Sequence, residues 1–477
     1  MVGVSVGVRA PRAAAVAILV AGLALAGCAG GGGGPSAPAD PQRNADAKSV
    51  TLVISANDAQ GGKNADEADW IVNYVIPEFT KQMAARGVTA QVTFQPSGVD
   101  DEQFKTRLSL DMRTGGRADI VTLDGIWVGE FADAGYVRPL ADVVGPTADS
   151  WDGWSQIPAA VQQLGTYDGK RYGIPYNTDG RVLYFNKELF AKAGLPADWQ
   201  PTSWQDVLDA GAKLKALPGV DPIQLNAGTA MGEAATMQGV LPLLAGTGSA
   251  LRAGGKWQGD TAAVRDVLGV YQKVYGGGLG DVTLQQDAKG RDKSFQEFAA
   301  GKIGILLESD YFWRSVVEPK QGIAPMPNRD QVVGFAKIPA QSPGKGPNGQ
   351  GFVSMSGGGV RMVNPATKSP QQAWKLLQFM NSAQAVTALV GDTPRITQRA
   401  DVNARTLGRD PLLTYISGQV LPVTAYRPST AEYPQVSHAL QQATAAVVAG
   451  TPPDQAAKKY GAALEGALGG AGDITSN

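Results

Sequence analysis

Short apolar runs alternate with segments of helical spacing along the first part of the chain. β-branched residues dominate 50–54 (VTLVI), and similar runs recur at 91–94 and 118–123. Such runs are typical of buried strands. Between them, apolar residues recur at helical spacing over 70–83 and 104–112. Strands that alternate with helices predict an α/β unit with a mostly parallel sheet.

The same alternation returns farther along the chain. The runs 181–185 (RVLYF) and 303–307 (IGILL) predict two more buried strands. Ser203 is a favourable N-cap for a helix that begins at Trp204, and Asp206 in its first turn suits the positive helix end. We therefore expect a second α/β unit.

Helix signals dominate the remainder. A helix over 293–300 is expected to stop at Gly301, because glycine is common just beyond a helix end. Another helix is expected to begin at Ser369-Pro370, since proline suits the first turn. One face of that helix is apolar, through Ala373, Leu376, Leu377 and Met380. From residue 411 onward the chain is expected to be mainly helical.

The N-terminus has the pattern of an export signal. Two arginines precede an apolar stretch, 13–26, that is too short to span a bilayer comfortably. Residues 25–28 (LAGC) resemble the bacterial lipobox, in which cleavage leaves the cysteine as a lipidated first residue. The sequence predicts a signal peptide over 1–27 and lipidation at Cys28. A plain signal peptide with an incidental cysteine is the alternative.

Residues 28–48 are rich in Gly, Pro, Ala and Asp. Such a segment has too few apolar groups to offset the entropy lost on ordering, so we expect a flexible tether. Cys28 is the only cysteine, which excludes an internal disulfide. The expected location is the outer face of the cytoplasmic membrane, with the protein anchored through lipidated Cys28.

Composition argues against several functions. The 477 residues carry 42 Lys and Arg against 43 Asp and Glu, which leaves no basic footprint for nucleic acid. Any Ser-His-Asp triad or His proton relay would have to use His438, the single histidine, which lies in a segment of helical spacing. We expect no catalytic residue, metal or cofactor. The length favours more than one lobe.

Two glycine-rich stretches differ in their context. Residues 344–349 (GKGPNG) match G-x-G-x-x-G in letters, but Pro347 and the lack of a following helix indicate a surface loop. Residues 356–359 (SGGG) directly precede the apolar run 360–363. Glycines there allow the backbone to approach a ligand or a neighbouring strand, with a simple bend as the alternative.

Five phrases stand out by their order and spacing along the chain: ADIVTLDGIWVGEFADAGYVRPL (118–140), YGIPYNTDGRVLYFNKELFAKAGL (172–195), PTSWQDVLDAGAKL (201–214), FAAGKIGILLES (298–309) and SPQQAWKLLQFM (369–380). Together they resemble the extracellular solute-binding proteins of sugar ABC importers, of the maltose/trehalose-binding type. Within that family, the actinobacterial-type trehalose-binding lipoproteins look closest.

The resemblance implies a two-lobed periplasmic-binding-protein-like fold of type II, with helices on mostly parallel sheets and a hinge that the chain crosses about three times. Lobe one would take 49–174 plus 360–395, and lobe two would take 177–355 plus 398–475. The lobes would close over a ligand in the cleft. The implied partners are a small sugar and the permease subunits of an ABC importer, and the chain would act as a monomer.

A sugar site needs aromatic faces for the C–H side of the ring and polar groups for its hydroxyls. Asp124 and Trp127 follow a strand end, in a loop that the family uses for ligand. Packing of Trp127 within its own lobe is the alternative. Asn177 and Asp179 follow the first hinge crossing, where turn chemistry alone would also explain them.

Lobe two would contribute three residues to the site. Glu308 follows a predicted strand, Tyr311 falls where the family places a stacking aromatic, and Arg427 falls where the trehalose binders reach the sugar. A surface ion pair is the alternative for Arg427. Further candidates for ligand contact are Gly357, Gly358, Asp58 and Asp101, the last two with N-cap roles as the alternative.

The expected ligand is a neutral α-linked disaccharide, trehalose or maltose. Tyr311 replaces the Trp common in relatives, and Asp179 replaces an Asn, so an extra hydroxyl donor or a cationic sugar is a further option. A secreted glycoside hydrolase is one alternative, although the sequence singles out no pair of carboxylates flanking one bond. The other is a binding protein for a non-sugar solute such as an amino acid, with Arg427 and Asp124 gripping its charges.

Overall fold

The computed structural model describes residues 40–62, 64–99, 101–391 and 393–476. Cys28 and the predicted signal peptide lie outside the described residues. Within the described ranges, none of the helices is both long and apolar enough to cross a membrane.

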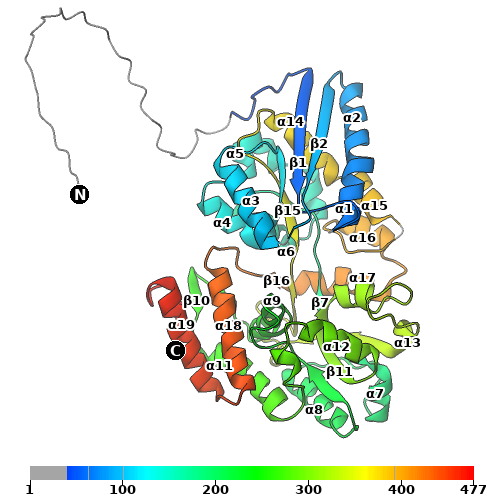
Figure 1. Cartoon of the computed structure of the whole chain (residues 1–477), viewed down its shortest axis with the longest axis vertical. Helices are drawn as coiled ribbons and strands as arrows, with labels where there is room; N and C mark the ends of the chain where they lie inside the picture. The colour runs from blue at the N-terminus through cyan, green and yellow to red at the C-terminus, as the bar shows by residue number, and fades with distance from the viewer. Residues whose placement is uncertain (1–39, 63, 100, 392, 477) are drawn as a thin grey trace, which may run out of the picture. The chain divides into compact units, whose positions relative to one another are not determined.

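The larger sheet has five strands among the described residues and packs on its own hydrophobic core (Figure 1). β1 lies between β2 and β3 and pairs in parallel with both. β15 pairs antiparallel with β3 and with β6. In sheet order the strands are β2 (Thr89–Pro96), β1 (Ser49–Ala56), β3 (Ile120–Asp124), β15 (Gly359–Val363) and β6 (Ile174–Pro175).

The second main sheet is covered on both faces. Leu183 and Phe185 belong to one hydrophobic core, and Val182 and Tyr184 belong to another. Successive side chains of a strand point to opposite faces, so these cores lie on the two sides of the sheet. In sheet order the strands are β12 (Val333–Ala336), β7 (Arg181–Asn186), β11 (Ile303–Ser309) and β8 (Asp221–Gln224).

Short strands form three small sheets in the described part of the chain. They are β13 (Ile338–Pro339), β14 (Phe352–Ser356) and β16 (Thr424–Tyr426); β9 (Arg252–Ala253), β10 (Lys256–Gln258) and β17 (Ile474–Thr475); and β4 (Thr166–Tyr167) with β5 (Lys170–Arg171).

Helices flank both main sheets (Figure 1). Those associated with the larger sheet are α1 (Ala65–Trp70), α2 (Ile76–Ala85), α3 (Asp101–Arg113), α4 (Val128–Asp133), α5 (Leu140–Val144), α6 (Ala159–Gln162), α14 (Pro370–Met380), α15 (Ala383–Val390) and α16 (Ala400–Thr406). Those associated with the second are α7 (Lys187–Lys192), α8 (Trp204–Leu214), α9 (Glu233–Ala235), α10 (Leu241–Gly246), α11 (Ala262–Tyr271), α12 (Gly290–Ala299), α13 (Arg329–Val332), α17 (Pro411–Tyr415), α18 (Tyr433–Val448) and α19 (Pro453–Leu468).

The predicted strands and helices are confirmed at their places, together with their local signals. Ser203 Oγ accepts a hydrogen bond from the Asp206 N–H at 3.2 Å, and the Asp206 carboxylate accepts one from the Ser203 N–H at 3.1 Å. Gly301 has φ +70°, as expected just beyond α12. The four apolar positions of α14 are buried. Residues 344–349 form a loop of turns and bends.

Strand direction differs from the expected mostly parallel sheets. Two of the four pairings in the larger sheet are antiparallel, and β7 runs antiparallel to both of its neighbours. A parallel pair needs a crossover connection of a dozen or more residues, usually a helix. β15 instead follows β14 through Gly357 and Gly358 alone and enters from the other core. The direction of β15 is therefore set by the chain returning from the other core. Hydrophobic periodicity does not reveal such a connection.

The last part of the predicted tether is held against α14. The side-chain amide of Gln371 donates to the carbonyl oxygen of Pro41 at 2.9 Å, and that of Gln372 donates to Asn44 and Ala45 at 2.8 and 3.0 Å. The expectation of a flexible tether up to residue 48 is therefore wrong for 41–45. Composition missed this contact because it relies on distant amides rather than on apolar burial.

Among the described residues, three connections join the cores: β6–β7, β14–β15 and the segment between α15 and α17. The third contacts both cores in turn, because Ile396 packs in the core of the second lobe. Val402 of α16 packs with Val386 and Val390 of α15, and Gln398 donates to Asn381 at 2.9 Å. Residues 398–403 thus lie against lobe-one helices before the chain returns to the second lobe.

Candidate functional site

Two crossing segments lie side by side where the lobes meet. Asn177 Oδ1 accepts a hydrogen bond from the Gly359 N–H at 2.7 Å, and Asp179 Oδ1 accepts one from the Gly357 N–H at 2.6 Å. A Cβ on Gly358 would lie 2.4 Å from the carbonyl oxygen of Asn177. The glycines therefore permit a close approach between neighbouring strands, so the simple bend does not account for them.

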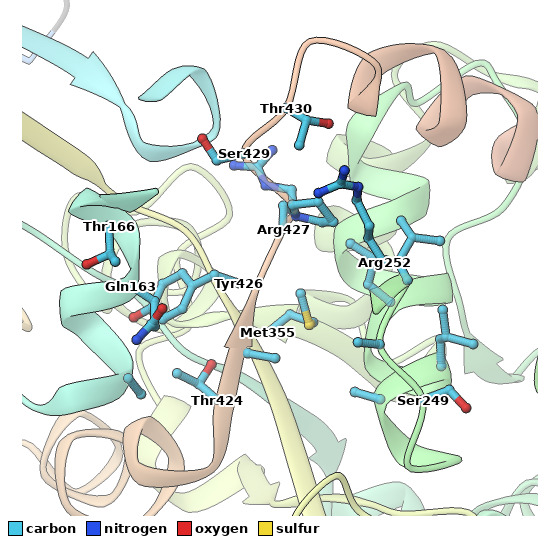
Figure 2. Close-up of a pocket in the computed structure, with 18 of the residues that line it drawn as sticks. Gln163, Thr166, Ser249, Arg252, Met355, Thr424, Tyr426, Arg427, Ser429 and Thr430 are labelled. Atoms are coloured by element: carbon cyan, nitrogen blue, oxygen red, sulfur yellow. The ribbon is translucent and has the colours of Figure 1, made fainter. Parts of the chain in front are cut away.

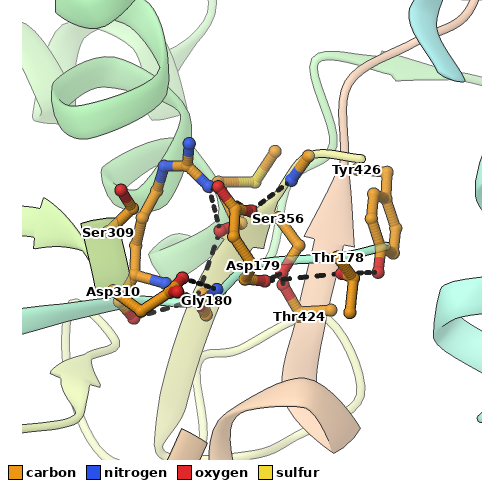
Figure 3. A network of polar contacts seen from close by, with 12 residues as sticks. Thr178, Asp179, Gly180, Ser309, Asp310, Ser356, Thr424 and Tyr426 are labelled. Carbon is orange, nitrogen blue, oxygen red and sulfur yellow. Dashed lines mark hydrogen bonds and ion pairs between the residues drawn. The ribbon is translucent and has the colours of Figure 1, made fainter. Parts of the chain in front are cut away.

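Asp179 is the centre of a half-buried polar network (Figure 3). Its carboxylate also accepts a hydrogen bond from Arg181 Nη1 at 2.9 Å. Burial alone would raise the pKa of Asp179. The Arg181 charge and the hydrogen bond from the Gly357 N–H lower it by more, so the pKa lies below its usual value and the carboxylate is charged. Beside it, Asp310 accepts from the Gly180 N–H at 3.2 Å and pairs with Arg314 at 2.9 Å.

Two polar cavities adjoin this crossing. One, of about 400 Å³, is lined by residues that include Asp179, Asp310, Arg314 and Gly357. The other, of about 220 Å³, lies at the carboxyl ends of β1 and β3. It is lined by Asn57, Asp58, Asn64, Asp101, Phe104, Thr122, Leu123, Asp124, Trp127, Tyr176, Asn177, Gly358 and Gly359. The two share Asn64, Tyr176, Asn177 and Gly358, so they are neighbouring parts of one interlobe region.

Arg427 joins the two lobes electrostatically. Its guanidinium lies 3.6 Å from the Asp124 carboxylate and 3.4 Å from that of Glu233. Burial disfavours its charge, but Asp124, Tyr433 and Glu233 raise the pKa of Arg427 above its usual value. Burial raises the pKa of Asp124, and Arg427 opposes that rise.

A third cavity, of about 810 Å³, lies beside β16 (Figure 2). Gln163 and Thr166 project from one wall and Ser249 and Arg252 from the other, with the Thr424–Arg427 strand between them. Its wall includes Arg427 but none of the other residues predicted for the ligand site.

The structure brings most of the predicted site residues together. Asp58, Asp101, Asp124, Trp127, Asn177 and Gly358 line the 220 Å³ cavity, and Asp179 and Gly357 line the 400 Å³ cavity. Trp127 is only 5% exposed and also belongs to the core of its lobe, as its alternative interpretation held. Contact of these residues with a ligand stays a prediction.

Glu308 and Tyr311 lie outside these cavity walls. Glu308 is fully buried and makes a bidentate pair with Arg291, at 2.6 and 2.8 Å. The Tyr311 ring has the guanidinium groups of Arg291 and Arg314 at 5.8 and 5.7 Å from its centroid. Arg314 lines the 400 Å³ cavity, which leaves Tyr311 one side chain away from it.

Sequence reasoning missed several polar residues of this region. Asn57 follows β1 and lies next to Asp58, and Thr122 precedes Asp124 by two positions in β3. The alternation of side chains in a strand would have placed Thr122 on the side of Asp124. Glu233 carried no local signal, because its partners Tyr433 and Ser437 lie about 200 positions away.

The sequence matches the family described as bacterial extracellular solute-binding protein over residues 64–387, more than half of the chain. The chain belongs to this family. The resemblance stated from the sequence is thereby confirmed at the level of the family, which is one of binding proteins rather than enzymes.

Individual relatives of this solute-binding protein are distant. A binding protein of Brucella abortus (strain 2308) is 25% identical over 279 residues, which cover 57% of this chain and 61% of the relative. The chain thus matches about three fifths of that relative's length. The sn-glycerol-3-phosphate-binding periplasmic protein UgpB of Rhizobium meliloti (strain 1021) is 27% identical over 173 residues, 35% of this chain and 40% of UgpB.

Solved structures share the fold over nearly their whole length. The sugar-binding protein MalE of Xanthomonas citri superposes with a TM-score of 0.70 at 18% identity, covering 88% of this chain and 98% of MalE. The cyclic α-maltosyl-1,6-maltose binding protein of Arthrobacter globiformis gives 0.68 at 21% identity, covering 88% and 99%. The expected two-lobed α/β fold is confirmed.

Proposed function

We propose that this chain is the substrate-binding lipoprotein of a sugar ABC importer. Two neighbouring interlobe cavities support this proposal. Carboxylates of the first lobe lie beside Trp127 in one, and Asp179 and Asp310 line the other. Acceptors and donors beside an aromatic face match the hydroxyls and C–H faces of a sugar. The captured sugar would pass unchanged to the permease subunits in the membrane.

We propose lipidated Cys28 as the anchor, at the outer face of the cytoplasmic membrane, with the protein acting as a monomer. Residues 49–174 plus 360–395 would form lobe one, and 177–355 plus 398–475 lobe two.

The proposed ligand is a neutral α-linked disaccharide, trehalose or maltose. The structural neighbours named for sugars support a carbohydrate, and the Arthrobacter protein is named for an α-glucosidic one. An amino-acid ligand has less support, because Arg427 and Asp124 already pair with each other. A hydrolase has less support because the family is one of binding proteins.

Isothermal calorimetry with mono- and disaccharides, amino acids and glycerol phosphate tests the proposal. We expect trehalose or maltose to bind at about micromolar strength, roughly −8 kcal/mol. Chromatography of the recovered ligand should return the sugar unchanged. Tight binding of an amino acid while every sugar fails would refute the carbohydrate assignment, and released glucose would indicate a hydrolase.

A further inference from the structure

Two residues that line the 220 Å³ cavity each have a buried polar atom without a hydrogen-bond partner among the described residues. Asn57 is 8% exposed, and its Nδ2 donates to the Val99 carbonyl oxygen and to Asp101 Oδ1, both at 3.0 Å. These bonds fix the amide so that Oδ1 is left as an acceptor without a partner. Thr122, 7% exposed, has an equally unpartnered Oγ1.

Strand geometry directs these atoms to one place. β1 and β3 are parallel neighbours, so their carboxyl ends meet at the same edge of the sheet. Asn57 follows β1, whereas Thr122 and Asp124 are two positions apart in β3 and therefore lie on the same side of that strand. All three line the cavity.

The charged side chains that line this cavity are all acidic. Its described lining residues include Asp58, Asp101 and Asp124 but no Lys, Arg or His. Arg427 pairs with Asp124 at 3.6 Å but lines the 810 Å³ cavity instead. Lys105, 5.9 Å from the Trp127 ring, is neutralised by Glu130 at 2.6 Å. An ionised carboxylate only accepts hydrogen bonds, so this wall favours ligand groups that donate and repels anions.

An apolar face completes the wall. Trp127 and Phe104 line the same cavity as the acceptors. A sugar ring has hydroxyl donors at its rim and C–H groups on its face, so it meets both kinds of surface. A phosphate group meets neither.

We infer that this cavity binds an unphosphorylated, hydroxyl-rich ring of the ligand, with Thr122 and Asn57 as determinants of specificity. The inference rests on the proposed sugar-binding function. Ring hydroxyls donate to Asn57 Oδ1, Thr122 Oγ1 and Asp124. Phosphorylated sugars and glycerol phosphate are excluded, which separates this chain from a relative named for sn-glycerol 3-phosphate.

Calorimetry on three threonine variants tests the inference. Thr122→Val keeps the shape but removes the hydroxyl, and Thr122→Ser keeps the hydroxyl. Thr430→Val is the matched control, because Thr430 is 6% exposed, its Oγ1 also lacks a partner, and it lines the 810 Å³ cavity. The probes are maltose, trehalose, trehalose 6-phosphate and sn-glycerol 3-phosphate, and thermal unfolding checks that each variant is folded.

We expect Thr122→Val to weaken binding of the neutral disaccharide about 5- to 30-fold, because one hydrogen bond is lost. Thr122→Ser and Thr430→Val should bind within about twofold of the wild type. Both phosphorylated probes should bind at least about 100-fold more weakly than the sugar.

The outcomes that overturn this inference differ from those that overturn the proposed function. A neutral sugar that binds Thr122→Val as tightly as the wild type removes the subsite but leaves sugar binding intact. A phosphorylated probe that binds more tightly than any sugar overturns the exclusion of anions. If no probe binds the wild type, the proposed function and the subsite fall together.

Discussion

Glu308, predicted as a ligand contact, forms an ion pair with Arg291 inside its own lobe. The Glu308 carboxylate is fully buried, and it also accepts a hydrogen bond from the Ser309 N–H at 2.8 Å. The side chain of Arg291 is 28% exposed, and its positive charge is paired with the Glu308 carboxylate. Its guanidinium also lies 5.2 Å from the centroid of Phe295. Glu308 therefore fixes α12 against β11.

Glu308→Gln should lower the free energy of unfolding by about 2–3 kcal/mol. Loss of one partner of a buried pair typically costs 3–5 kcal/mol, and the partial exposure of Arg291 reduces that cost. Urea unfolding measures the change. Glu78→Gln is the control, because Glu78 and Lys81 form an exposed pair at 3.9 Å, and it should change stability by at most about 0.5 kcal/mol. Unchanged stability together with lost sugar binding would return Glu308 to the ligand site.

At the scale of elements, α4 of the first lobe and the segment after β16 fit together without a gap. The Gly129 N–H donates to Ser429 Oγ at 2.7 Å. A Cβ on Gly129 would lie 1.6 Å from the Ser429 carbonyl oxygen. Thr178 and Tyr426 share a hydrogen bond at 3.0 Å nearby. Glycine at position 129 is thus required by this contact between lobes rather than by the helix.

Gly129→Ala should weaken the contact between the lobes, and with it ligand binding. Alanine favours a helix by about 1 kcal/mol over glycine, so α4 itself gains, but its methyl group displaces the Ser429 segment. We expect sugar affinity to fall at least tenfold. Gly269→Ala in α11, where a Cβ meets nothing within 4 Å, should stabilise the protein and leave affinity unchanged. Equal affinities for the two variants would contradict a role for this contact in closure.

Local signals explain which elements could be predicted. The strand at 181–185 and the cap at Ser203 depend on neighbours within a few residues, and both are confirmed. The pairing of Gly129 with Ser429 joins positions 300 apart, and the acceptor left over on Asn57 depends on Asp101, 44 positions away. Such features are created by tertiary packing, so hydrophobic periodicity and propensity carry no trace of them.

At the scale of the whole molecule, the proposed function requires a hinge. Three passages join the cores, and polar groups of both lobes face the interlobe cavities. A ligand that contacts both lobes favours the closed arrangement, because only closure makes both sets of contacts. A ligand shifts the equilibrium between the open and closed arrangements only by the difference between its affinities for the two.

Saturating sugar should therefore compact and stabilise the protein. At about 100 times its dissociation constant, a ligand that binds only the folded state adds about 2.7 kcal/mol to the free energy of unfolding. Small-angle scattering should record a smaller radius of gyration, and calorimetric scanning a higher Tm. A nonbinding sugar from the same panel serves as the control. A radius that stays constant while Tm rises would indicate binding without closure.

Under the proposed function, the contact between Gly129 and Ser429 also affects how fast a bound sugar leaves. That hydrogen bond and the Arg427–Asp124 ion pair must both break before the lobes separate, so they add to the barrier for release. The ion pair is partly exposed on the Asp124 side, and its contribution falls with ionic strength. Added salt should therefore shorten the residence time of the bound sugar. The association rate of a neutral sugar should change less, because it carries no charge for salt to screen. In the proposed importer, the permease would have to separate the lobes against these two contacts.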